Sequence, residues 1–232
     1  MIPQGSVDFH AHWLFGLDDG AQTPEDTLTL LHTFRELGYS KLAASPHISD
    51  SLYENTPSGI LARLDEVRQL AKENNIPLEL HATAEYLLDS AFPALIEHKN
   101  LIPLNKKYLL VELSYLSPPV HLRQLIFDIQ LAGFIPILAH PERYPYYFKS
   151  LSEIEAIKNS GCLLQLNLLS SVGYYGPEVA AAAEELLKRD WIDFACTDMH
   201  HQRHIRAFSD RVKIKGYEKL TQAVANNAKV LA

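Results

Sequence analysis

Residues 8–12 read Asp-Phe-His-Ala-His, and residues 18–20 read Asp-Asp-Gly. A strand that ends in this way places several nitrogen and oxygen ligands in one small space, as a divalent metal site requires. Two histidines that are two residues apart also fit a half-buried strand with a polar edge. The rest of the chain must decide between the two interpretations.

Seven short segments that are rich in apolar or β-branched residues predict β-strands. They lie near residues 6–10, 41–45, 78–84, 108–113, 134–139, 162–167 and 192–196. Helical patterns separate most of them, and several have cap residues or prolines at their starts and a glycine at their ends. The helices are expected from Thr23 to near Gly38, from Thr56 onward, between Pro119 and Gly133, and over residues 152–159, 177–189 and 217–230.

Strands that alternate with helices predict an α/β fold with a parallel sheet and helical crossovers. Seven such units suggest a TIM-like (β/α) barrel that is short of one unit. A doubly wound open sheet is the main alternative, but the glycine-rich nucleotide fingerprint that would favour it is missing from the sequence. No linker composition or internal repeat divides the chain, so one domain over residues 1–232 is expected.

The composition is that of an ordinary soluble protein, with 47% hydrophobic and 21% charged residues. The formal net charge of −7 argues against nucleic acid as the main partner. Cys162 and Cys196 have no paired spacing, so neither a disulfide framework nor a zinc ribbon is indicated. No leader pattern and no apolar run of about 18 residues occurs, which predicts a cytoplasmic chain without membrane insertion. The oligomeric state is not predicted.

Polar residues of the metal-binding kind follow six of the seven predicted strands. They are His10 and His12, His47, Glu85, Glu112, His140, and Asp198 with His200. Each one alone also fits a solvated loop residue. In parallel α/β folds, however, the carboxyl ends of the strands meet on one face, so we expect these side chains to converge there. Glu112 supports this, since a carboxylate within an apolar run is costly unless a cation compensates it.

Several other chemistries lack their signatures. A cysteine-dependent phosphatase needs an arginine six residues after the nucleophile, but Leu168 and Gln202 stand there. Neither a Gly-x-x-x-x-Gly-Lys loop nor a Gly-x-Ser-x-Gly turn is present. A metal-dependent reaction is therefore favoured.

As an ordered set, these motifs resemble the polymerase and histidinol phosphatase (PHP) superfamily. The pieces that discriminate are Asp-Asp-Gly at residues 18–20, Leu-Val-Glu-Leu at 110–113 and His-Pro-Glu-Arg-Tyr at 140–144. Within the superfamily, the chain is most similar to the bacterial manganese-dependent protein-tyrosine phosphatases of capsule and exopolysaccharide operons. The resemblance covers about residues 7–206.

The resemblance implies a distorted seven-stranded (β/α) barrel, the PHP fold, with three divalent metal ions. Carried over residue by residue, the ligands would be His10, His12, Glu85 and Asp198 for one ion, Glu85, Glu112 and His140 for a second, and Asp19, His47 and His200 for the third. Asp8 would orient a ligand histidine. Asp18 is the less favoured ligand of the acidic pair. The sequence departs from the family at Ile48, where a second histidine is common, and at residues 197–200, which read Thr-Asp-Met-His.

For the reaction, the resemblance implies that a hydroxide bridging the metal ions attacks phosphorus. Arg143, together with Arg203 or Arg206, would neutralise the phosphoryl oxygens, because a guanidinium can bind two of them at once. His47 or His200 could assist the leaving group. Mixed carboxylate and imidazole ligands suit Mn²⁺, with Fe or Zn²⁺ as alternatives.

The predicted function is hydrolysis of phosphotyrosine on a protein, with the tyrosine-rich tail of a bacterial kinase of polysaccharide export as the expected partner. The alternative enzyme is a small-molecule phosphoesterase such as histidinol-phosphate phosphatase. A module that binds a phosphorylated partner without cleaving it is the second alternative. His201 and His204 remain ambiguous, since they follow His200 in a polar segment.

Overall fold

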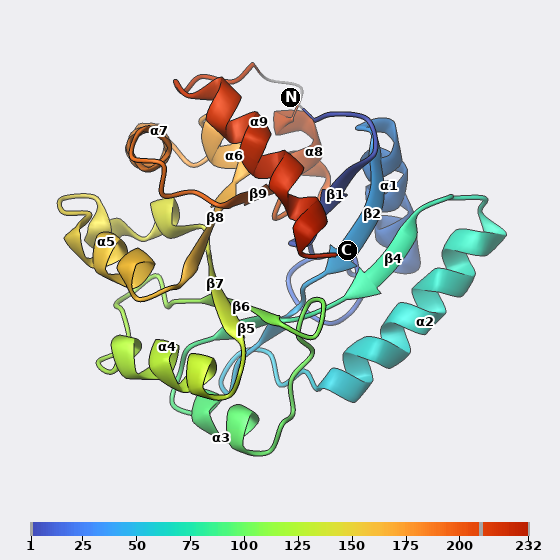
Figure 1. Ribbon diagram of the computed structural model, residues 1–232. Coiled ribbons are helices and arrows are strands. Elements are labelled where there is room, and N and C mark those ends of the chain that lie inside the picture. The colour runs from blue at the N-terminus through green and yellow to red at the C-terminus, as the bar shows by residue number, and fades with distance from the viewer. Residues whose placement is uncertain (1, 209–210, 232) are drawn as a thin grey trace.

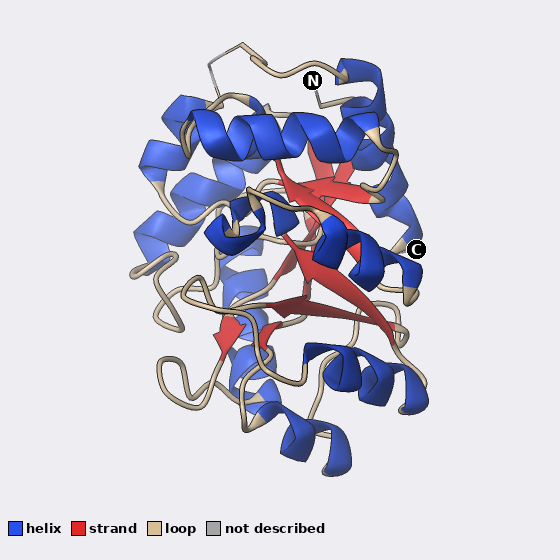
Figure 2. Ribbon diagram, turned by 90° about the vertical axis from the view of Figure 1, so that its left-hand side faces the viewer, coloured by secondary structure: helices blue, strands red, loops and turns tan. Residues whose placement is uncertain are grey.

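The computed structural model describes residues 2–208 and 211–231, and within them nine strands form two parallel sheets. The first sheet has the order β1-β2-β4 and the second the order β3-β5-β6-β7-β8-β9. The strands are β1 (Ser6–Asp8), β2 (Tyr39–Ala44), β3 (His47–Ile48), β4 (Glu79–Ala82), β5 (Glu85–Leu87), β6 (Tyr108–Glu112), β7 (Ile135–Ala139), β8 (Leu163–Asn167) and β9 (Phe194–Cys196). The expected α/β architecture with parallel strands is confirmed, and the strands lie among the helices (Figures 1 and 2).

The expected count of seven strands is corrected, because two of the seven segments are interrupted. The second one breaks between β2 and β3 at Pro46, which has no N–H to donate to a ladder. The third breaks between β4 and β5. The Thr83 N–H still donates to the Ala44 carbonyl at 2.7 Å, and the Glu85 N–H donates to that of Pro46 at 3.1 Å. Each break moves the chain from the first sheet to the second.

The helices are α1 (Pro24–Glu36), α2 (Pro57–Glu73), α3 (Phe92–Glu97), α4 (Leu122–Leu131), α5 (Ser152–Asn159), α6 (Leu168–Ser171), α7 (Pro177–Lys188), α8 (Gln202–Ala207) and α9 (Tyr217–Asn226). Helix α1 begins as its sequence predicts, since the Thr23 side chain accepts from the Asp26 N–H and the Asp26 side chain accepts in return. The short helices α3, α6 and α8 were not predicted. None of the helices in the described ranges is long and apolar enough to cross a membrane.

One apolar cluster contains side chains from both sheets. Val7 and Ala43 come from the first sheet, and Leu110, Ile137 and Phe194 come from the second. The neighbours of Leu110 along β6 belong instead to the larger cluster beneath the helices, as expected when successive side chains of a strand point to opposite faces. The two sheets therefore face each other across the smaller cluster.

The first and last strands approach each other at their carboxyl ends. A parallel bridge joins Ala11 to Met199, and the Asp198 N–H donates to the His10 carbonyl at 2.8 Å. On the amino-terminal side of this bridge, within both strands, the side chain of Asn227 donates to the carbonyls of Val7 at 2.9 Å and Ala195 at 2.8 Å. The bridge places the segment after β9 beside the segment after β1, and Asn227 links the two strands themselves.

Candidate metal centre

Every residue predicted to bind metal follows or ends a strand, although His47 and Glu85, which follow β2 and β4, are themselves the first residues of β3 and β5. His10, His12 and Asp19 follow β1, while Asp198 and His200 follow β9. The remaining ones are His47 in β3, Glu85 in β5, Glu112 at the end of β6 and His140 after β7. The parallel arrangement of the strands is what brings together residues from both ends of the sequence.

The first group consists of His10, His12, Glu85 and Asp198, whose ligand atoms all lie within 4.8 Å of one another. His10 Nε2 is 3.0 Å from Glu85 Oε2 and 3.2 Å from Asp198 Oδ1. His12 Nε2 lies 3.5 Å and 3.3 Å from the same two oxygens. All four residues are buried. Two imidazoles and two carboxylates thus meet in one buried space.

Further polar side chains fix the orientation of this group. Gln165 Oε1 lies 2.7 Å from His10 Nδ1, and Asp18 Oδ2 lies 2.7 Å from His12 Nδ1. A proton on each Nδ1 leaves the Nε2 lone pair of each ring free to face the group. Asp18 therefore orients a histidine, which agrees with the preference for Asp19 over Asp18 as the ligand.

The second group shares Glu85 with the first. His47 Nδ1 is 2.9 Å from Glu112 Oε1 and 3.3 Å from Glu85 Oε2. His140 Nε2 lies 2.9 Å from the other Glu85 oxygen, Oε1. The set expected here was Glu85, Glu112 and His140. The group whose ligand atoms lie within 4.8 Å of one another consists of His47, Glu85 and Glu112, and His140 lies beside it at Glu85 Oε1. Glu85 joins the two groups, since its Oε2 faces His10, His12 and His47, while its Oε1 faces His140.

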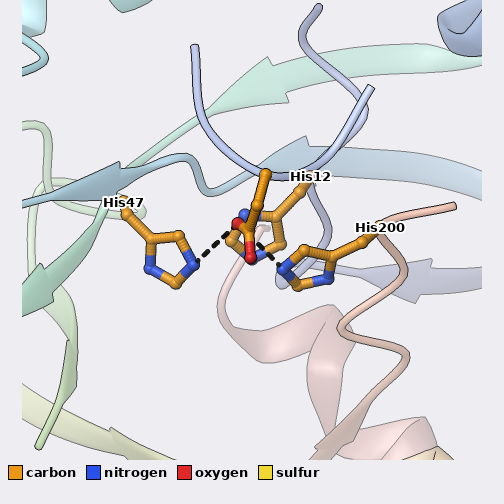
Figure 3. Close-up of side chains that lie close together, drawn as sticks. His12, His47 and His200 are labelled. Carbon is orange, nitrogen blue, oxygen red and sulfur yellow. Dashed lines mark ion pairs between the residues drawn. The ribbon is translucent and has the colours of Figure 1, made fainter. Parts of the chain in front are cut away.

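The third group contains the residues expected there, Asp19, His47 and His200, together with His12. Asp19 Oδ1 lies 3.4 Å from His47 Nε2 and 3.5 Å from His200 Nε2 (Figure 3). The ring of His200 stacks on that of His12 at 3.8 Å between centroids. The three groups are thus contiguous, since neighbouring groups share His12, His47 or Glu85.

The backbone around the groups is unusual at three positions. Asp198 and His140 have positive φ angles of 49° and 36°, a region that non-glycine residues rarely adopt. Such strain persists where the surroundings impose it, and it is concentrated at functional sites. A Cβ at Gly20 would lie 2.1 Å from the His12 carbonyl oxygen. Only glycine lets the loop that carries Asp19 lie this close to the histidine.

Several buried ligand atoms have no hydrogen-bond partner within the described ranges. They include His12 Nε2, His47 Nδ1 and Asp198 Oδ1. Leaving a buried polar atom unsatisfied costs about 1–3 kcal/mol. These atoms point into the three groups, where a cation would satisfy all of them. The donor set is therefore one that fits divalent metal ions.

The pKa values of the clustered histidines and carboxylates are shifted by burial and by one another. Burial by itself would lower the pKa of His10, but the carboxylates of Glu85 and Asp198 raise it to about 10. Burial acts to raise the pKa values of Glu85 and Asp198, yet the neighbouring histidines, His10 first among them, hold both well below the usual range. Burial, aided by His12, lowers the pKa of His200 to about 3. The carboxylates of the first group thus favour a positive charge beside them.

The groups open into a cleft of about 410 Å³. Arg143 is part of its lining, and its Nη1 donates to Asp198 Oδ2 at 2.7 Å. Burial would lower the pKa of Arg143, but the neighbouring Tyr115 and Asp198 raise it above its ordinary value, so the guanidinium stays charged. One arginine is thus available to an anion in the cleft.

The two other candidate arginines are placed differently. Arg203 and Arg206 lie on α8, are exposed, and are not among the residues that line the cleft. His204 from the same helix does line it, as does His201. A catalytic role of either arginine stays a prediction.

The sequence did not identify Tyr115 and Tyr175 as cleft residues. Both line the cleft and contact the Arg143 guanidinium, whose Cζ lies 5.1 Å from the ring centroid of Tyr115 and 4.1 Å from that of Tyr175. Asn167 was also missed as an orienting residue, although its Nδ2 donates to Asp198 Oδ2 at 2.7 Å. Its position as a polar residue at the end of an otherwise apolar strand was the available signal.

The sequence profile of the family described as "Capsular polysaccharide synthesis, CpsB/CapC" matches residues 6–228. The chain belongs to this family. The match includes every residue of the three groups, so the metal-binding geometry lies within the part of the chain that defines CpsB/CapC.

Relatives with names support this assignment. The tyrosine-protein phosphatase YwqE of Bacillus subtilis is 28% identical over 196 residues, which cover 84% of this chain and 77% of YwqE. The tyrosine-protein phosphatase CpsB of Streptococcus pneumoniae is 26% identical over 203 residues, 84% of this chain and 83% of CpsB.

A solved structure is also similar. It comes from crystal structures of YwqE from Bacillus subtilis and CpsB from Streptococcus pneumoniae, which are described as unique metal-dependent tyrosine phosphatases. The TM-score is 0.87 at 25% sequence identity, and the match covers 97% of this chain and 94% of the other.

Proposed function

We propose that this chain is a metal-dependent protein-tyrosine phosphatase. The observation that carries the proposal is a cleft in which three contiguous groups of metal-binding side chains lie beside one charged arginine. A phosphoryl group needs cations on several oxygens as its charge redistributes, and this cleft supplies them at one place. The relatives named as tyrosine phosphatases give the substrate class.

Three divalent ions would be held by the residues of the three groups, with His140 completing the surroundings of Glu85. Mn²⁺ is the proposed ion, since mixed imidazole and carboxylate ligands suit it. When bound, such ions supply Lewis acidity and lower the pKa of a coordinated water. The side chains Gln165 and Asp18 keep the Nε2 atoms of His10 and His12 directed inward.

Arg143 binds and orients the phosphoryl group. Its guanidinium is held by Asp198 at 2.7 Å and keeps further N–H donors for two phosphoryl oxygens. The tyrosine leaving group has a pKa of about 10, so it departs with little help from a proton donor. His47 and His200 border the same cleft and are the side chains placed to assist.

The proposed partner is a tyrosine-phosphorylated protein, namely the tail of a bacterial tyrosine kinase of polysaccharide export, in the cytoplasm. The family's description as capsular polysaccharide synthesis supports this setting. With a net charge of −7, the protein offers little general attraction to an acidic tail. Recognition therefore takes place at the phosphotyrosine itself.

We also propose that residues 1–232 form one domain and that the two sheets form the distorted barrel of the PHP fold. The apolar cluster shared by both sheets and the bridge between Ala11 and Met199 support a closed arrangement.

The experiment that tests the function compares two substrates. Protein loaded with Mn²⁺ should release phosphate from a phosphotyrosine peptide faster than from histidinol phosphate. Release from histidinol phosphate alone would replace the proposal by the small-molecule alternative. Binding of the phosphopeptide without release would favour the non-catalytic module. Metal analysis after gentle purification should find a bound transition metal.

A further inference from the structure

Two tyrosines flank Arg143, and the structure gives them different surroundings. Tyr175 is the more enclosed one, since its hydroxyl accepts a hydrogen bond from Asn167 Nδ2 at 3.1 Å and its ring centroid lies 4.1 Å from Arg143 Cζ. The same Asn167 amide donates to Asp198 Oδ2 at 2.7 Å, and Asp198 binds Arg143. Tyr175 is therefore tied into the contacts that hold the arginine.

Tyr115 is placed for contact with a ligand. It lies in the loop between β6 and α4, three residues after Glu112, and it is 41% exposed while it lines the cleft. Its ring stacks on His140 with 5.9 Å between centroids and 17° between planes, and Arg143 Cζ lies 5.1 Å from its centroid. The ring thus stands beside His140 and the Arg143 guanidinium and still has free surface.

We propose that Tyr115 is a specificity-determining residue that selects aryl phosphoesters over alkyl phosphoesters. The inference rests on the proposed function and deepens it. A phosphoryl group bound beside Arg143 and His140 carries its ester substituent outward past Tyr115. An aryl substituent packs against the tyrosine ring there, whereas the short side chain of a phosphoserine ends before it.

Contact between the Tyr115 ring and an aryl group of the ligand sets the size of the expected change in affinity. Two aromatic rings in contact gain roughly a twofold to tenfold advantage beyond the area that they bury. An alkyl group gains only the burial of a few carbons. The contribution of Tyr115 is therefore expected in the ratio of aryl to alkyl affinity rather than in the affinity for phosphate.

Two phosphonates test this ratio without hydrolysis, since their P–C bond replaces the ester. Binding of phenylphosphonate and of methylphosphonate to the Mn²⁺-loaded protein is measured by calorimetry, for the wild type and for Tyr115→Leu. The substitution should weaken phenylphosphonate by about fivefold and change methylphosphonate by less than about twofold. An equal loss for both ligands would show that Tyr115 acts only by holding Arg143 or His140, and this would overturn the proposal. Unchanged affinity for both would overturn it as well.

Control variants make the result specific. Tyr115→Phe keeps the ring and should keep the aryl preference. Leu116→Ala changes the next residue of the same loop, which is 93% exposed and is not among the residues that line the cleft, and it should leave both affinities unchanged. If Tyr115→Leu does not fold, Tyr115→Gln takes its place. A loss of aryl preference in Tyr115→Phe would contradict the stacking basis of the proposal.

The failure of the proposed function is distinguishable from the failure of this inference. The proposed function fails when the wild type releases no phosphate from a phosphotyrosine peptide. The inference fails when the wild type is active and binds phenylphosphonate, but its preference for the aryl ligand does not depend on Tyr115.

Discussion

The protein interior differs between the carboxyl ends and the amino ends of the strands. At the carboxyl ends, buried residues such as His12 and Asp198 have ligand atoms that no group in the described part of the chain satisfies. At the amino ends, the interior is apolar, and Val230 and Leu231 from the end of the chain pack against it. Asn227 there donates to the carbonyls of Val7 and Ala195 and so links β1 to β9.

This difference indicates that residues at one end of the strands stabilise the fold and residues at the other end serve function. The amino end is completed by the chain itself, so its side chains stabilise the fold. The carboxyl end fits cations that the chain does not supply, so its side chains are expected to serve binding. Substitutions at the two ends should therefore have different consequences, and the following predictions test that division from the largest expected effect to the smallest.

The largest effect is expected for Glu85→Gln. Glu85 contributes to two of the three groups, and glutamine keeps its size while removing the charge. The metal content should fall, and turnover of a phosphotyrosine peptide should drop by on the order of a thousandfold. Metal analysis and phosphate release measure the two effects. A variant with full metal content and full turnover would break the assignment of the carboxyl end to binding.

Arg143→Ala should lower turnover by about a hundredfold, because a preorganised donor to the phosphoryl oxygens is lost. The metal content should remain that of the wild type, since Arg143 belongs to none of the three groups. Arg203→Ala and Arg206→Ala are the matched variants, and each should reduce turnover less. A larger loss in either of them would restore these arginines to the catalytic role that the resemblance implies.

Asn227→Ala tests the opposite end. Its amide donates to two buried carbonyls, so the substitution should lower the free energy of unfolding by about 2 kcal/mol. Urea denaturation measures this, while the folded variant should keep its metal content and turnover. Asn226→Ala, which removes one part-buried bond to the Asp193 carbonyl, should cost less. Loss of turnover at unchanged stability would contradict the division between the ends.

The carboxyl end was largely predictable from the sequence, and the amino end was not. His47, Glu85 and Glu112 could be predicted because each follows or ends a predicted strand, and parallel strands bring such ends together. The contact of Asn227 with Val7 joins residues 220 positions apart, and a single asparagine after a helix gives no signal of it. Tyr115 was missed for a similar reason, since the direction of a loop side chain depends on packing that periodicity does not encode.

The smallest effect is expected for Gln165→Leu, which removes no proposed ligand. Gln165 Oε1 lies 2.7 Å from His10 Nδ1, and its own Nε2 donates to the Leu166 carbonyl, which fixes which amide atom faces the histidine. Without this acceptor, the proton is no longer held on Nδ1, and His10 loses the preference for presenting a free Nε2. Metal affinity should fall by about tenfold, as is usual when the partner of a ligand histidine is removed.

Gln165→Glu keeps an acceptor at this position, so it should retain the affinity that Gln165→Leu loses. Competition with a chelator measures both variants. Equal affinity of the Leu variant and the wild type would mean that the carboxylates of the group alone fix the state of His10. In that case metal binding at the carboxyl ends would not depend on Gln165 of β8. The ligands alone would then determine binding, and the two ends of the strands would be more independent than the structure implies.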